Sequence, residues 1–269
     1  MPTTTPGAKT AAWLNADAYE RYMGRWSRRV APLFLSWLAV APARRWLDVG
    51  CGTGALSAAI LECCAPRSLM GADPSEGFLR KAREQLGDRA SLECASASVM
   101  PFGDAAVDVT VSALLLNFAP DASAALAEMT RVTASGGTLG AYVWDYGGKM
   151  DLIRMFWDAA IELDPQASGL DEGAYAALCR PEALAALFMR CGLAKVDVHG
   201  IEIAMPFGSF DDFWQPFLGG QGPAPAYAMS LAEPARERLR ERLRARLPLS
   251  ADGSAVLAAC AWAVRGVVR

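Results

Sequence analysis

The most restrictive feature of the sequence is a short apolar segment that runs directly into a glycine-rich loop. Residues 44–47 have strand character and lead into residues 48–54, which read Asp-Val-Gly-Cys-Gly-Thr-Gly. Gly50 and Gly52 allow a tight turn and a close backbone approach to a ligand, where a Cβ atom would collide. The Ala-rich run at residues 55–61 predicts a helix just beyond the loop. This strand–loop–helix pattern is typical of a nucleotide-type cofactor site.

Two cofactor classes use such a loop, and the acidic residues help to separate them. Gly50, Gly52 and Ala55 satisfy the dinucleotide spacing, so the glycines alone do not decide. Asp48 favours S-adenosylmethionine, because its carboxylate would repel the two phosphates of a dinucleotide and attract a sulfonium and an ammonium. Asp73 ends the next apolar segment, where an acidic residue meets ribose hydroxyls in a βαβ unit, and it is compatible with either cofactor.

These residues resemble the class I S-adenosylmethionine-dependent methyltransferases, in particular the bacterial small-molecule branch near the ubiquinone/menaquinone biosynthesis enzymes. The resemblance extends from about Tyr19 to the C-terminus. It is carried by residues 19–26, 48–54, 73–75, 100–102 and 131–137. It implies an α/β, Rossmann-like fold with a seven-stranded, mostly parallel sheet whose last strand is antiparallel. It also implies a helical N-terminal flap and lid insertions.

The resemblance further implies a set of cofactor contacts. The predicted cofactor-binding residues are Tyr22, Met23, Arg25, Asp48, Gly50, Cys51, Gly52, Gly54, Asp73, Pro74, Ser75, Ser96, Ala97, Ser98 and Leu114. In such enzymes the N-terminal helix closes on the methionine end of the ligand, with Arg25 available to its carboxylate. Ser96 stands where the family usually has an Asp that receives the adenine amino group, so a weaker adenine contact is expected. S-adenosyl-L-homocysteine would be the product.

Strand and helix signals alternate along the chain, which predicts right-handed crossovers and a mostly parallel sheet. Helical spacing also predicts one or two helices within residues 16–38. Strands are expected at residues 46–49, 69–72, 90–94, 107–112, 138–144, 195–204 and 256–264, with helices at 55–63, 76–86, 122–132 and 181–191. Ligands of such sheets gather at the carboxyl ends of the strands.

Two aromatic-rich segments, about residues 145–180 and 205–230, are predicted to be insertions that form the lid and walls of a substrate pocket. The alternative is an ordinary hydrophobic core under a long loop. The predicted substrate-binding residues are Asn117, Trp144, Trp157, Trp214 and Phe217. Asp145 and Tyr146 are the candidate catalytic residues, although Asp145 could instead cap a helix. A structural role is favoured for His199, the only histidine.

Composition bounds the remaining possibilities. The 269 residues, 53% of them apolar, can bury a sizeable core, and we expect a single domain at residues 16–269 after a disordered tail at residues 1–15. A net charge of −3 gives no general attraction to nucleic acid or to an anionic membrane, and no apolar run is long enough to span a bilayer. The arginine-rich stretch at residues 236–246 is expected to be a solvated helix face with glutamate–arginine pairing.

The cysteines argue against a metal site. Seven cysteines without a Cys-x-x-Cys pair, and a single histidine, make a zinc site improbable, so no metal is expected. The odd count without a signal peptide favours the cytoplasm. A monomer or homodimer is expected.

The predicted function is S-adenosylmethionine-dependent methyl transfer to an oxygen, nitrogen, sulfur or activated carbon of a small molecule. One alternative is a non-catalytic member of the fold that binds the cofactor. A second is an NAD-dependent oxidoreductase. Asp48 and Gly54 oppose the second, as does the lack of a basic residue between Gly50 and Ile60.

Overall fold

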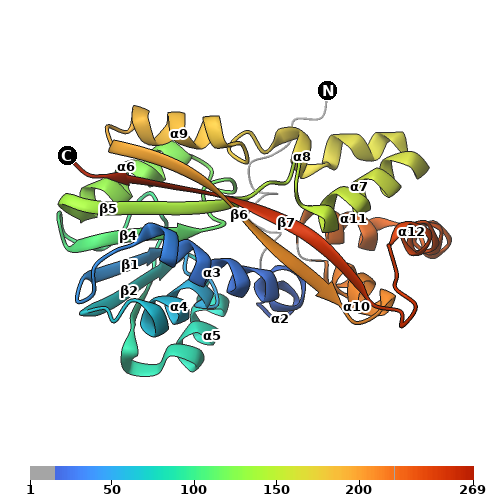
Figure 1. Ribbon diagram of the computed structural model, residues 1–269, viewed down its shortest axis with the longest axis horizontal. Helices are drawn as coiled ribbons and strands as arrows, with labels where there is room; N and C mark the ends of the chain where they lie inside the picture. The colour runs from blue at the N-terminus through green and yellow to red at the C-terminus, as the bar shows by residue number, and fades with distance from the viewer. Residues whose placement is uncertain (1–15, 221) are drawn as a thin grey trace. The chain divides into compact units, whose positions relative to one another are not determined.

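A seven-stranded sheet with the order β3-β2-β1-β4-β5-β7-β6 organises the chain (Figure 1). The computed structural model describes residues 16–220 and 222–269, so the predicted tail at residues 1–15 lies outside the described residues. The strands are β1 Arg45–Val49, β2 Ser68–Asp73, β3 Ser91–Cys94, β4 Val107–Ala113, β5 Thr133–Trp144, β6 Ala194–Phe207 and β7 Ala255–Val267.

Pairing directions agree with the predicted fold. Strands β1 to β5 pair in parallel, in the order β3-β2-β1-β4-β5. The Gly136 N–H donates to the Val268 carbonyl oxygen at 2.8 Å, and the Val268 N–H donates to the Gly137 carbonyl oxygen at 3.0 Å. These bonds join the start of β5 to the residue after β7, and past the other end of β5 the Asp145 N–H donates to the Cys260 carbonyl oxygen at 2.9 Å, so the two strands run antiparallel. The predicted mostly parallel sheet with an antiparallel last strand is therefore confirmed.

The residue contacts divide the chain into two compact units. Of the described residues, the first unit contains 16–25, 144–177, 202–220 and 222–260, and the second contains 26–143, 178–201 and 261–269. Most of the two predicted insertions, 145–180 and 205–230, belongs to the first unit. The single-domain organisation stays a prediction.

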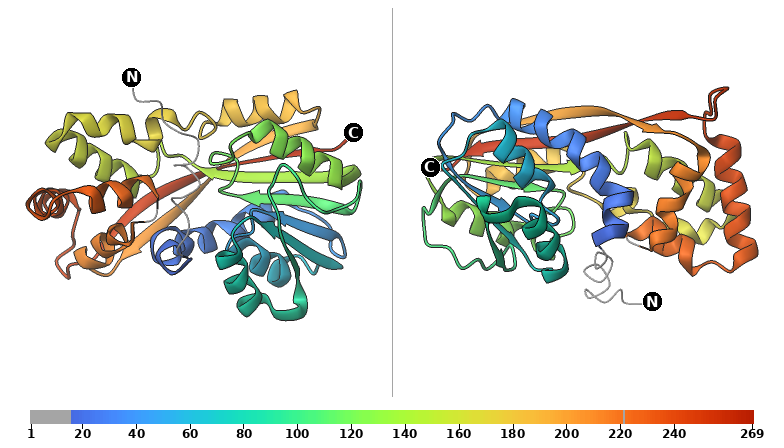
Figure 2. Two further views of the ribbon diagram at one scale, coloured as in Figure 1. Left: turned by 180° about the vertical axis from the view of Figure 1, so that it is seen from behind. Right: turned by 90° about the horizontal axis from the view of Figure 1, so that it is seen from below.

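Helices cover both faces of the sheet in the second unit (Figures 1 and 2). Helices α3 (Arg25–Leu38), α4 (Ala55–Cys63) and α5 (Glu76–Leu86) lie on one face. Helices α6 (Ala122–Val132) and α9 (Pro181–Arg190) lie on the other, and the short helix η2 (Gly87–Arg89) follows α5. The predicted bounds of α4, α5 and α6 are confirmed.

Two kinds of contact, side-chain caps and close packing on the sheet, position these helices. Side-chain caps start two of them, since Ser75 accepts from Phe78 N and Asp121 accepts from Ala124 N. The close fit of α3 on the sheet depends on Gly140 of β5, where a Cβ atom would lie 2.8 Å from Leu38 and 3.1 Å from Phe34. Burying such large apolar side chains contributes about 1.5–3 kcal/mol each.

Strands β5, β6 and β7 exceed their predicted bounds by the most residues. Strand β5 begins at Thr133 rather than at residue 138, because a register shift against β4 and a positive φ of 75° at Gly136 let the chain continue as a strand. Strand β6 extends to Phe207, and β7 covers Ala255–Val267. In β6 buried and more exposed residues alternate, which is the pattern of a strand with one face in the core.

The first unit is mainly helical. It contains α2 (Ala16–Tyr19), the π-helical turn η1 (Glu20–Gly24), α7 (Asp151–Leu163), η3 (Pro165–Leu170), α8 (Glu172–Tyr175), α10 (Phe210–Trp214), η4 (Gln215–Gly219), α11 (Pro223–Ser230) and α12 (Glu233–Arg246). Aromatic rings fill its interior. The rings of Phe156 and Phe217 stack with centroids 4.6 Å apart, and Trp157 lies 5.3 Å from Phe156.

Four of the six arginines of α12 pair with carboxylates, as predicted. Arg240 pairs with Glu237 of the same helix at 3.0 Å. Arg242 and Arg246 both pair with Glu162 of α7, which runs beside α12. Most of the positive charge of this helix is therefore compensated. Within residues 16–220 and 222–269, no helix is long and apolar enough to cross a membrane.

Candidate functional site

The glycine-rich loop after β1 has the geometry that its sequence predicts. Gly50, Gly52 and Gly54 have φ values of 71°, 55° and 89°, in the left-handed region that favours glycine. The N–H groups of Gly50 and Cys51 both donate to the Ala72 carbonyl oxygen, at 2.7 and 3.1 Å. The loop is thereby attached to the carboxyl end of β2, directly before α4.

Gly52 differs from its two neighbours in what surrounds it. A Cβ atom at Gly50 would lie 3.0 Å from Leu115, and one at Gly54 would lie 3.2 Å from Leu86. At Gly52 the nearest atom of the described residues would be 3.9 Å away. The α-carbon of Gly52 therefore borders free space, where a ligand can approach the backbone.

We expect Gly52→Ala to weaken binding of S-adenosylhomocysteine by about tenfold. The left-handed conformation costs an alanine about 1–2 kcal/mol, and the added methyl group enters the free space beside the loop. Calorimetric titration measures the change. Gly103→Ala is the matched control, since that position has an ordinary φ and no neighbour within 4 Å. Equal affinities for the two variants would mean that no ligand approaches Gly52.

Asp73 connects the glycine loop with the following loop. Its carboxylate accepts hydrogen bonds from Gly52 N at 3.0 Å and from Ser75 N at 2.8 Å. Burial raises the pKa of Asp73, and these two N–H groups oppose the increase. Asp73, which is predicted to meet the ribose hydroxyls, thus also fixes the glycine loop at Gly52 and the following loop at Ser75.

Asp48 is more deeply placed than the sequence suggests. Its side chain is fully buried, and Oδ2 accepts a 2.7 Å hydrogen bond from Ser57 Oγ of α4. Its Oδ1 has no partner among the described residues. Burial raises the pKa of Asp48 to about 7; the Ser57 hydroxyl lowers it, and the charge of Asp73 raises it further. A cation near this pair of carboxylates would favour their ionised forms.

Further buried polar atoms lack partners where β4 ends. Ser112 Oγ and Asn117 Oδ1 form no hydrogen bond within the described residues. Between them Leu114 adopts a φ of 57°, which is strained for a branched residue, while its N–H donates to the Tyr142 carbonyl oxygen at 2.8 Å. An unpaired buried polar group costs about 1–3 kcal/mol, so these atoms mark a place that a ligand or water would stabilise.

Ser96 lies on the surface in the turn after β3. Its Oγ is 3.0 Å from Ser98 Oγ and accepts a 3.4 Å hydrogen bond from Ser98 N. Both serines are exposed, and Ala97 between them is half-buried. The role of Ser96 in binding adenine stays a prediction.

The predicted site residues fall into two groups. The second unit contains Asp48, Gly50, Cys51, Gly52, Gly54, Asp73, Pro74, Ser75, Ser96, Ala97, Ser98, Leu114 and Asn117. The first unit contains Tyr22, Met23, Arg25, Trp144, Asp145, Tyr146, Trp157, Trp214 and Phe217. The hydrogen bonds that Asp73 accepts from Gly52 N and Ser75 N bring together the loops after β1 and β2, which are the most specific part of the motif.

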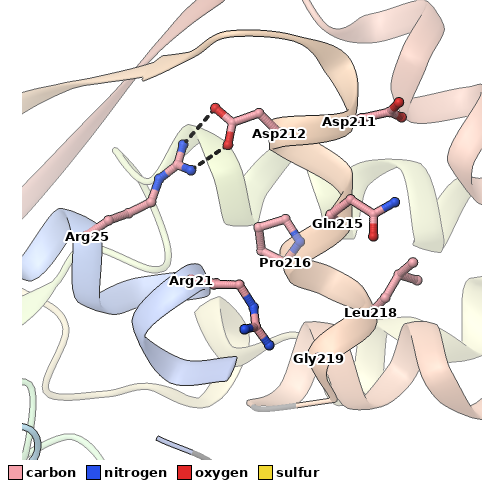
Figure 3. Close-up of a pocket in the computed structure, with 8 residues that line it drawn as sticks. All are labelled: Arg21, Arg25, Asp211, Asp212, Gln215, Pro216, Leu218 and Gly219. Carbon is pink, nitrogen blue, oxygen red and sulfur yellow. Dashed lines mark hydrogen bonds and ion pairs between the residues drawn. The ribbon is translucent and has the colours of Figure 1, made fainter. Parts of the chain in front are cut away.

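In the first unit, Arg25 is engaged by a carboxylate of the protein. Its guanidinium pairs with Asp212 at 2.6 and 3.3 Å and lies over the Phe207 ring at 4.8 Å from the centroid (Figure 3). The sequence assigned this guanidinium to the cofactor carboxylate and did not single out Asp212. The signal available for Asp212 was an acidic pair, Asp211 and Asp212, within an aromatic run.

The aromatic residues predicted to contact a substrate are buried. Trp144, Trp157 and Phe217 are 0% exposed and Trp214 is 3% exposed. They form part of the core of the first unit, and a role in substrate binding stays a prediction.

The two candidate catalytic residues have structural contacts. The Asp145 carboxylate accepts from Lys149 N at 3.0 Å and so caps the turn before α7. Tyr146 is buried. In the second unit, His199 stacks on Trp37 with centroids 5.8 Å apart. The catalytic roles of Asp145 and Tyr146 remain predictions.

A buried carboxyl group that the sequence analysis missed lies in the first unit. Glu172 is 3% exposed and accepts a hydrogen bond from the Trp157 indole N–H. Burial raises the pKa of Glu172 to about 7. The neighbouring Asp171 pairs with Arg154. The acidic pair Asp171-Glu172 ahead of a glycine was the only local signal.

The second-unit residues fit S-adenosylmethionine better than a dinucleotide. The free space beside Gly52 lets a ligand reach the loop, and the unpartnered oxygen of Asp48 belongs to a pair of carboxylates that favours a cation. A diphosphate would meet two negative charges there and no Lys or Arg between residues 50 and 60. Within the described ranges, no three His, Cys, Asp or Glu side chains are arranged to hold a metal ion.

Comparison with known proteins agrees with this geometry. A family model described as a methyltransferase domain matches residues 47–141. Malonyl-[acyl-carrier protein] O-methyltransferase of Geobacter sulfurreducens is 30% identical over 184 residues, which cover 68% of this chain and 67% of that protein. Uncharacterized protein Rv1405c of Mycobacterium tuberculosis is 30% identical over 146 residues, or 51% of this chain. That match spans 53% of the relative, so the chain spans about half the length of the first curated relatives it matches.

A solved structure extends the agreement to the fold. Haemonchus contortus phosphoethanolamine N-methyltransferase 2, in complex with S-adenosyl-L-methionine, matches with a TM-score of 0.58 at 15% identity. The match covers 94% of this chain and 56% of that one. The glycine loop, the sheet order and the relative from Geobacter lead to one conclusion. The chain belongs to the class I S-adenosylmethionine-dependent methyltransferases.

Proposed function

We propose that the protein transfers a methyl group from S-adenosylmethionine to an oxygen, nitrogen, sulfur or activated carbon of a small molecule. The observation that carries the proposal is the glycine loop, whose free space at Gly52 is bordered by a backbone that Asp73 holds. The cofactor supplies a methyl group already activated by its positive sulfur. The residues of the chain therefore have to bind and orient the reactants and to exclude water.

The proposed role of Asp73 is to fix the loop and to receive the ribose hydroxyls. The proposed role of Asp48 is electrostatic, because its buried carboxylate supplies negative charge near the loop for a cationic ligand. The Ser57 hydroxyl holds the Asp48 carboxylate in place by donating a hydrogen bond to it. None of these residues needs to move a proton for the methyl group to be transferred.

A small molecule is the proposed acceptor because most of the positive charge of α12 is compensated. Four of the six arginines of this helix pair with carboxylates, so it offers little free basic surface to a nucleic acid. The relative from Geobacter is named malonyl-[acyl-carrier protein] O-methyltransferase, which supports oxygen among the candidate nucleophiles.

The proposed transfer can be tested with methyl-labelled S-adenosylmethionine and an unfractionated cell extract, which is separated after the reaction into small-molecule, nucleic-acid and protein fractions. We expect the label to appear in a small molecule, and Asp73→Ala to abolish its appearance. A label found only in nucleic acid or protein would contradict the small-molecule proposal. Binding of the cofactor with no transfer to any fraction would favour a non-catalytic member of the family.

Asp48→Asn tests the electrostatic role of Asp48. The amide keeps an acceptor for the Ser57 hydroxyl but carries no charge, so we expect affinity for S-adenosylmethionine to fall about tenfold at pH 8. Because the pKa of Asp48 is about 7, affinity of the unmodified protein should rise between pH 6 and pH 8 more than that of the variant. Calorimetry at both pH values measures this, and titration of the ligand's own amino group is common to both proteins. Parallel pH profiles would contradict the assignment.

A further inference from the structure

A pocket of about 670 Å³ lies within the first unit, apart from the glycine loop. It is lined by Arg21, Arg25, Asp211, Asp212, Gln215, Pro216, Leu218 and Gly219 (Figure 3). Arg21 comes from η1 and Arg25 from the start of α3, and the other residues come from α10 and η4. Its volume is in the range of pockets that hold small molecules.

The charges around this pocket leave one cation uncompensated. Arg25 and Asp212 neutralise each other through two contacts, at 2.6 and 3.3 Å. Asp211 lies 3.4 Å from Arg240 and 4.0 Å from Arg244 of α12. Both acidic residues of the lining are therefore already paired.

Arg21 is the exception. Within the described part of the chain its guanidinium has no ion pair, and its side chain is exposed. Figure 3 shows the Arg21 side chain extending from η1 toward the part of η4 that carries Leu218 and Gly219. The pocket thus presents a free positive charge to a ligand.

The rest of the lining indicates the chemical class of that ligand. A guanidinium presents a planar fork of N–H donors that matches the two oxygens of a carboxylate. The Gln215 amide offers a further donor, and Pro216 and Leu218 provide apolar surface for a hydrocarbon group. An organic acid with one carboxylate and a small apolar body meets all of these features.

We propose that this pocket binds a small organic acid, with its carboxylate on Arg21 and its apolar part against Pro216 and Leu218. The proposal concerns binding in the first unit alone and does not depend on the proposed methyl transfer. It assigns a ligand to Arg21, a residue to which neither the cofactor motif nor the family gives a role here.

Calorimetric titration of the full chain with benzoate tests the proposal, with benzamide as a neutral ligand of the same shape, at constant ionic strength. We expect benzoate to bind at least tenfold more tightly than benzamide. Arg21→Gln should weaken benzoate binding at least tenfold, and Arg21→Lys should weaken it less, because it keeps the charge but loses the fork. Arg238→Gln is the matched control, since Arg238 is an exposed arginine of α12 outside the pocket lining.

Several outcomes would overturn the proposal. Equal binding of benzoate and benzamide would remove the role of the charge. Unchanged benzoate binding in Arg21→Gln would place the acid elsewhere. Loss of benzoate binding in the presence of saturating S-adenosylhomocysteine would mean that the acid takes the place of the cofactor carboxylate and not a separate site. Binding of S-adenosylhomocysteine to Arg21→Gln at normal affinity shows that the variant is folded and keeps this test apart from that of the proposed function.

Discussion

Replacement of Asp73 by alanine is expected to lower the affinity for S-adenosylhomocysteine by about a hundredfold. The carboxylate accepts hydrogen bonds from Gly52 N and Ser75 N, one on each of the two loops that frame the predicted cofactor site. Hydrogen bonds to a charged group are worth about 1.5–3 kcal/mol each, so losing two of them releases the glycine loop as well as the predicted ribose contact. Calorimetric titration of both proteins measures the change.

The control for this prediction is a second carboxylate of the same unit. Asp108 pairs with Arg45 at 2.7 Å and has no contact with the loop, so Asp108→Ala should bind the ligand with nearly normal affinity. Asp73→Asn keeps one acceptor oxygen and should fall between alanine and the native residue. An Asp73→Ala protein that is folded and binds as tightly as the native one would remove Asp73 from the site.

The free energy of unfolding is expected to decrease as the pH rises from about 4.5 to about 7, and Glu172→Gln should remove a large part of this decrease. The pKa of Glu172 is raised to about 7 by burial, whereas an unfolded glutamate titrates near 4.5. A folded pKa above the unfolded one means that the stability of the protonated form is fully present below pH 4.5 and is lost as the pH rises through 7. The shift corresponds to about 3 kcal/mol.

Urea unfolding at pH 5 and pH 8, followed by tryptophan fluorescence, measures this effect. Glutamine keeps an oxygen that can accept from the Trp157 indole N–H, so the variant should be more stable than the native protein at pH 8 and similar at pH 5. The pKa of Asp48 is raised from 3.8 to about 7 for the same reason, so roughly half of the native slope should persist in Glu172→Gln until Asp48→Asn is added. Glu233→Gln, at an exposed position of α12, should leave the slope unchanged. A native slope in Glu172→Gln would mean that Glu172 is ionised at little cost.

Local signals in the sequence were sufficient for much of the second unit. The bounds of α4, α5 and α6 follow from apolar periodicity and from caps such as Ser75 and Asp121, all of which lie within a few residues of the helix they start. The glycine loop could be predicted because Gly50, Gly52 and Gly54 have positive φ angles, which glycine adopts readily. The predicted start of β5 was wrong because Gly136 and Gly137 resemble a turn in the sequence, whereas pairing with the distant Val268 keeps them in a strand.

Contacts between distant residues could not be predicted in the same way. Asp212 is 187 residues from Arg25, and no local pattern connects the two. Glu172 and Trp157 lie on different helices of the first unit, and Ser57 looks like an ordinary small residue of an apolar helix. The sequence therefore identified carboxylates such as Asp48 and Asp73 as candidates, but tertiary packing decides which of them are buried and what they contact.

The most direct test of the account is parallel calorimetric titration of the purified protein with S-adenosylhomocysteine and with NADH. The free space at Gly52 and the negative charges of Asp48 and Asp73 predict micromolar binding of S-adenosylhomocysteine and no binding of NADH. Binding of NADH without binding of the adenosyl ligand would contradict the role given to Asp48 and, with it, methyl transfer as the function of this protein.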